Sequence, residues 1–233
     1  MNTVPAPHVF VPPTAALRSL LLRMGALAEE QVRASVAALV RADPELATAA
    51  ILRDPELDAM ELEVDEASLT LLARRQPVAA DLRLVVAAMR TAGELERIGD
   101  HAVGIAHAVR DLSGRAFPGL PHLEEMGTIA GEMLTAALDH LVRADAEQAM
   151  LLCRRDERVD ALLDRLTHQL ASVMSADPRE VAPGMALLRV GRNLERIADL
   201  ATNIAEDVVY VVEGRRFQRG RDAAGERLRR LRQ

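Results

Sequence analysis

One seven-residue motif occurs twice in this chain, and the duplication constrains the fold more than any other feature. The first copy is Glu94-Leu95-Glu96-Arg97-Ile98-Gly99-Asp100, and the second is Asn193-Leu194-Glu195-Arg196-Ile197-Ala198-Asp199. Corresponding residues are 99 positions apart, and an Ile-Ala pair follows each copy at the same offset. Solenoid repeats have much shorter periods, of roughly 20–50 residues. The sequence therefore predicts a duplicated domain.

The composition indicates the class of that domain. Aromatic residues make up only 2% of the 233 residues, and Trp is absent. The core must therefore be built from Leu, Ala, Val, Ile and Met, among which Ala and Leu are strong helix formers. Long amphipathic segments joined by short turns make neighbouring helices antiparallel. We expect an all-α protein made of two tandem, pseudo-symmetric three-helix bundles.

Proline and capping residues set the expected boundaries. Asp43-Pro44 and Asp177-Pro178 each read as an N-cap followed by a proline at the first helical position. Pro55 predicts a kink or break inside the second helix. The expected helices cover residues 14–41, 43–75, 78–110, 122–143, 145–175 and about 178–213. The expected organisation is an extended segment 1–13, a first bundle 14–112, a linker 113–121, a second bundle 122–214 and a basic tail 215–233.

Charge is distributed unevenly along the chain. The formal net charge is −6, but the tail carries +6 and residues 1–214 carry −12. An acidic body disfavours nucleic-acid binding and favours cations. The tail suits peripheral contact with an anionic membrane surface or an acidic partner, or it is simply a solvated helix end. With one cysteine, Cys153, no signal-peptide pattern and no long apolar run, a cytoplasmic protein is expected.

Four pairs of acidic residues share the helical spacing i, i+4, which places both members of a pair on one helix face. In an antiparallel hairpin, two residues on the facing helices lie side by side when the mean of their residue numbers equals the residue number of the turn. By this rule the pair 54/58 lies level with 96/100 across Pro77, and 156/160 lies level with 195/199 across Asp177-Pro178. The sequence predicts a first acidic row (Asp54, Asp58, Glu96, Asp100) and a second acidic row (Asp156, Asp160, Glu195, Asp199).

Converging carboxylates suit hard or borderline cations such as magnesium, manganese, calcium, iron or zinc. Two alternatives remain open at this point. The acids could form a metal-free scaffold and pair only with Arg, since Arg97 and Arg196 are adjacent to them. They could also serve a carboxylate-bridged metalloenzyme, although the Glu-x-x-His motif of di-iron bundles is absent. Glu61 and Asp65 have the same spacing but are expected to lie outside the main group.

The motifs resemble those of the PhoU family, the accessory and regulatory proteins of bacterial phosphate-specific transport. The resemblance rests on Arg75-Gln76-Pro77-Val78-Ala79-Ala80-Asp81-Leu82-Arg83, on both copies of the duplicated motif, and on Asn203-Ile204. It covers nearly the whole chain and implies two three-helix bundles with multinuclear metal clusters on their surface. By motif match the implied ligands are Asp54, Asp58, Glu96, Asp100, Asp156, Asp160, Glu195, Asp199 and Asn203.

The resemblance also implies a role. It implies a non-enzymatic protein that represses the phosphate-starvation response and contacts both the ATPase subunit of the phosphate ABC transporter and a phosphate-sensing histidine kinase. A homodimer is expected, with iron, zinc, manganese or magnesium as the bound ion. The family often has Asn four residues after the motif Asp. Asn203 fits that pattern but Gly104 does not, so the sequence favours the second acidic row as the stronger site.

Overall fold

The computed structural model describes residues 14–112 and 120–215, and every regular element in these ranges is helical. The expected all-α class is confirmed. The predicted lead-in 1–13, nearly all of the predicted linker, and residues 216–233 of the tail lie outside the described residues. The elements are α1 (Ala15–Arg41), α2 (Pro44–Leu52), α3 (Asp54–Arg75), α4 (Ala79–Leu112), α5 (Leu120–Arg143), α6 (Ala146–Leu152), α7 (Glu157–Ala176), the short 3₁₀ helix η1 (Pro178–Glu180) and α8 (Val181–Glu213).

The predicted cap and break in the first half are confirmed. Asp43 Oδ1 accepts hydrogen bonds from the backbone N–H groups of Glu45 at 2.9 Å and Leu46 at 3.1 Å, with Pro44 at the first position of α2. The helix breaks before Pro55, so that α2 and α3 are separate helices. This break matters for the site, because it places Asp54 at the very start of α3.

The second half corrects one prediction. Residues 145–175 were expected to form one helix, but α6 ends at Leu152 and α7 begins at Glu157. This segment contains no proline, and its break matches the first-half break in position, since Arg155-Asp156 corresponds to Arg53-Asp54. At the break, α6 packs against α5 and α8, and the chain turns before α7 follows the same two helices. Local propensity alone did not indicate it.

The last hairpin has the expected signals. Asp177 accepts a hydrogen bond from the Arg179 N–H at 2.9 Å and begins η1. Residues 178–180 form η1, so α8 begins at Val181 rather than at the expected residue 178. Pro183 fits in the first turn of α8, where backbone N–H groups have no intrahelical partner. Gly214 ends α8 in the left-handed conformation, with φ 70°, and its N–H donates to the Tyr210 carbonyl at 3.0 Å.

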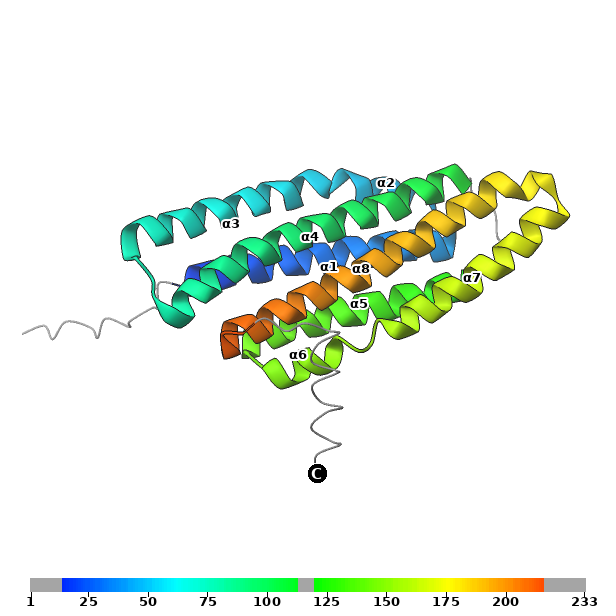
Figure 1. Cartoon of the computed structure of the whole chain (residues 1–233). Coiled ribbons are helices and arrows are strands. Elements are labelled where there is room, and N and C mark those ends of the chain that lie inside the picture. The colour runs from blue at the N-terminus through cyan, green and yellow to red at the C-terminus, as the bar shows by residue number, and fades with distance from the viewer. Residues whose placement is uncertain (1–13, 113–119, 216–233) are drawn as a thin grey trace, which may run out of the picture.

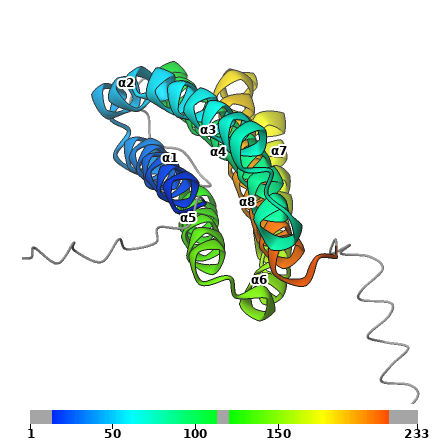
Figure 2. The same cartoon turned by 90° about the vertical axis from the view of Figure 1, so that its left-hand side faces the viewer.

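The two halves pack through α4 and α8, which run antiparallel and next to each other at the centre (Figure 1). Viewed from the end, α1 and α5 lie together on one side of the molecule, with the α3–α4 hairpin and α8 on the other (Figure 2). One continuous apolar core joins the halves. Among the described residues, no helix is long and apolar enough to cross a membrane.

Candidate metal centre

The duplicated motif divides its residues between the core and the surface. Its Leu and Ile side chains are fully buried: Leu95, Ile98, Leu194 and Ile197. Because these residues fix the rotation of α4 and α8, the intervening acids are directed toward the outer face of each hairpin. Glu96 and Glu195 are consequently half-buried at the helix–helix boundary. The apolar half of the motif therefore determines where its carboxylates lie.

The α3–α4 hairpin has the register that the turn arithmetic predicts. Gly99 of α4 faces Leu57 and Asp54 of α3, and Gly93 faces Glu61. Residues 54 and 58 therefore lie level with residues 100 and 96.

The first acidic row carries mutually repelling charges. The pKa of Glu96 is raised, first by partial burial and then by the carboxylates of Asp100, Glu61, Asp58 and Asp54. Within the described residues, no Arg lies at ion-pair distance from Asp54, Asp58, Glu96 or Asp100. Arg97, the basic residue of the motif, contacts Glu94 instead at 3.3 Å. Among residues 14–112 and 120–215, the row therefore has no counter-charge at ion-pair distance.

Glu61 faces Gly93, which agrees with its predicted place outside the main group, but its charge still reaches the first acidic row. Burial raises its pKa, and so do the charges of Asp65 and Asp58. Its carboxylate in turn raises the pKa of Glu96. The available signal was spacing: residues 54, 58, 61 and 65 follow a single helical face. The sequence interpretation treated the pairs separately and so did not indicate this effect on Glu96.

The charge of the second acidic row is partly compensated by Arg196. Asp160 has a raised pKa through burial, Asp199, Asp164 and Glu157. Burial and Asp199 raise the pKa of Glu195, while Arg196 lowers it. Arg196 lies 3.5 Å from the Glu195 carboxylate and 3.2 Å from that of Asp199.

Asp156 differs from its counterpart Asp54. It is only 3% exposed and occupies the N-cap position of α7. Its charge is not among those that shift the pKa of Asp160 or Glu195. Asp160, Glu195 and Asp199 therefore lie close enough for their charges to affect one another.

Asn203 and Gly104 lie at the boundary between α8 and α4. Asn203 Nδ2 donates to Glu94 Oε1 on α4 at 3.4 Å. Gly104 faces Asn193, whose Oδ1 lies 3.1 Å from His101 Nδ1. Gly104 and Asn203, the corresponding residues that differ between the two halves, therefore both contribute to the α4–α8 contact.

The residues of the first acidic row fit a cation in their chemistry. In the described parts of the chain, no three His, Cys, Asp or Glu side chains are arranged to hold a single ion as they stand. The fit rests on a donor set made only of carboxylates, on their mutual repulsion, and on a buried polar atom beside them. Gln31 Oε1 is fully buried and, within the part of the chain that the structure describes, lacks a hydrogen-bond partner.

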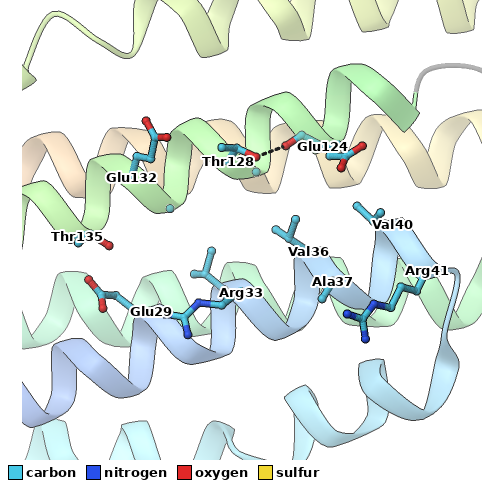
Figure 3. Close-up of a pocket in the computed structure, with 13 residues that line it drawn as sticks. Glu29, Arg33, Val36, Ala37, Val40, Arg41, Glu124, Thr128, Glu132 and Thr135 are labelled. Atoms are coloured by element: carbon cyan, nitrogen blue, oxygen red, sulfur yellow. Dashed lines mark hydrogen bonds between the residues drawn. The ribbon is translucent and has the colours of Figure 1, made fainter.

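A separate groove of about 390 Å³ lies between α1 and α5 (Figure 3). Val36 and Val40 point from α1 toward α5, and the Thr128 hydroxyl donates to the Glu124 carbonyl at 2.9 Å. None of the predicted ligands lines this groove. The acidic rows are therefore separate from this groove.

Comparisons with known proteins agree with the duplicated architecture. The PhoU domain model matches residues 21–109 and 123–208, one match in each half. The phosphate-specific transport system accessory protein PhoU of Serratia marcescens is 38% identical over 92% of this chain and 88% of its own length. The protein of the same name from Escherichia coli K12 is 35% identical over 93% and 89%.

Solved structures show the same fold. The crystal structure of PhoU from Pseudomonas aeruginosa superimposes with a TM-score of 0.84 at 37% identity, covering 87% of this chain and 98% of that one. The phosphate transport system regulatory protein PhoU of Streptococcus pneumoniae gives 0.81 at 29% identity, covering 87% and 96%. With a family model matched in each half and relatives above one-third identity over most of its length, the chain belongs to the PhoU family.

Proposed function

We propose that this chain is a non-enzymatic accessory protein of a phosphate-uptake system, and that it represses the phosphate-starvation response when phosphate is plentiful. The names of its relatives support the link to phosphate transport. The partners that we propose are the ATPase subunit of a phosphate ABC transporter and a phosphate-sensing histidine kinase, both reached from the cytoplasm. We also propose that the protein acts as a homodimer.

A bound cation is part of this proposal, and the first acidic row is its main site. The observation that carries it is the environment of Glu96, a half-buried carboxylate surrounded by four other carboxylates with no Arg among the charges that shift its pKa. A divalent cation would remove this repulsion, and carboxylates are suitable ligands for iron, zinc, manganese or magnesium. Arg196 already offsets part of the charge of the second acidic row. The sequence favours the second row, whereas the electrostatics favour the first.

Complementation tests the regulatory role. A bacterium that lacks its own PhoU gene would carry this chain on a plasmid, and its alkaline phosphatase activity would be measured in high and low phosphate. We expect the chain to restore low phosphatase activity in high phosphate. Unchanged high activity, with the protein present at normal levels, would reject the repressor role.

Variants of the first acidic row then test whether the regulatory role requires the carboxylates that would bind the cation. Glu96→Gln with Asp100→Asn removes two charges from the first acidic row while preserving side-chain size. We expect this variant to lose most of the repression. Glu66→Gln is the matched control, since Glu66 is an exposed acid of α3 that contributes to none of the shifted pKa values in either row.

A further inference from the structure

A fully buried amide lies directly behind the first acidic row. Gln31 of α1 is 0% exposed, although its side chain is polar. Its Nε2 donates to Asp54 Oδ1 at 3.2 Å and to the Ala50 carbonyl at 3.4 Å. A side chain on a third helix therefore holds the carboxylate that begins α3.

Two acceptors define the orientation of this amide. The Asp54 carboxylate and the Ala50 carbonyl both require a donor, so the nitrogen of Gln31 faces them. Its oxygen then points into the space that a side chain at position 99 would fill, 3.0 Å from that Cβ position, and has no hydrogen-bond partner among the described residues. Asp54 Oδ1 lies 3.7 Å from the same point. A buried polar atom without a partner is unfavourable for folding and therefore requires a reason.

The second half of the chain shows that folding alone does not require the amide. The halves align at an offset of 102 residues before the motif, as Arg53-Asp54 against Arg155-Asp156 shows. At that offset Gln31 corresponds to Met133, which is also 0% exposed. An apolar side chain fills the same core position in the second bundle, and there the corresponding acid, Asp156, is buried at 3% exposure.

We infer that Gln31 is a positioning residue for cation binding: its buried amide orients the Asp54 carboxylate toward the first acidic row, and the second bundle lacks this device. The inference rests on the proposed cation site. Groups behind a metal ligand fix its orientation, and their loss typically weakens metal affinity about 10- to 100-fold. Gln31 contacts Asp54 and not the cation, so it acts through the ligand.

The test replaces Gln31 with the residue that the second bundle uses. Gln31→Met would be made in the full-length chain carrying Glu195→Gln and Asp199→Asn, so that the first acidic row dominates binding. Manganese(II) alone is the probe. Its binding is measured by calorimetric titration and by the electron paramagnetic resonance signal of the free ion. We expect about 10-fold or greater weakening of manganese binding. We also expect the melting temperature without metal to change little, because removal of the unpartnered oxygen offsets the loss of the two hydrogen bonds that Nε2 donates.

Ser35→Ala is the control. Ser35 lies on α1 one turn beyond Gln31, is 0% exposed, has no partner for its hydroxyl, and corresponds to Ala137. It should leave manganese affinity unchanged. If Gln31→Met lowers the melting temperature but not the manganese affinity, the amide is structural. The inference about Gln31 then fails, while the proposed cation site stands. If the parent protein binds no manganese, the proposed cation site fails and the inference with it.

Discussion

Gly99 of α4 and Leu57 of α3 leave no room for a side chain between them. A Cβ built on Gly99 overlaps Leu57 Cδ2 and lies 3.0 Å from Gln31 Oε1. The second half places Ala198 at this position of the motif and has Val159 where the first half has Leu57. Since Val is smaller than Leu, we expect the two differences to compensate each other.

Gly99→Ala should therefore destabilise the protein by about 1–3 kcal/mol, the usual cost of overpacking a core. Leu57→Val in the same chain should recover part of that loss, and a double-mutant cycle from urea unfolding would measure the coupling. Gly131→Ala is the control: no atom lies within 4 Å of its Cβ position, so the higher helix propensity of Ala should stabilise the protein slightly. Additive effects of Gly99→Ala and Leu57→Val would contradict the steric explanation.

Removing metal should lower the melting temperature. A cation that binds only the folded state stabilises it by about 2.7 kcal/mol at 100 times its dissociation constant. Protein treated with a chelator and dialysed would be compared with the same protein reloaded with manganese or zinc, using scanning calorimetry. Identical melting curves after thorough chelation would contradict a structural role for the cation.

Neutralising Glu96 should have opposite effects with and without metal. Burial and four neighbouring carboxylates disfavour its charge, so Glu96→Gln should raise the melting temperature of the metal-free protein. The same change removes a ligand and should weaken manganese binding at least about 10-fold. Glu66→Gln should change neither quantity. Lower stability without metal would show that the charge of Glu96 is favourable in the fold.

The metal-free protein should become more stable on mild acidification. The pKa values of Glu61, Glu96, Asp160, Glu195 and Glu206 are all raised, with burial as the first cause in each case. The folded state thus binds more protons than the unfolded chain just above the ordinary carboxyl pKa of about 4, and the free energy of unfolding falls as pH rises through that window.

Melting temperatures of dialysed protein between about pH 5 and pH 7 would measure this dependence, and the value at pH 5 should be the higher. The double variant Glu96→Gln and Glu195→Gln should flatten the curve, because two of the five groups no longer titrate. A melting temperature that rises with pH would contradict the assignment.

Much of the fold was predictable because its signals are local. The helical class followed from composition, and the Asp43-Pro44 and Asp177-Pro178 caps followed from turn chemistry. The break between α6 and α7 was not predicted, because no proline marks it. Helix boundaries at the linker also moved, with α4 continuing to Leu112 and α5 beginning at Leu120.

The sequence by itself determined which residues of the α3–α4 hairpin lie side by side, because helical spacing and hairpin arithmetic depend only on residue numbers. It did not determine that Arg196 turns toward its row while Arg97 turns away, since an exposed Arg can reach several partners. It also did not indicate Gln31, which lies 23 residues from Asp54 on another helix. Only packing brings that amide behind the carboxylate, because its position depends on how three helices meet in the core.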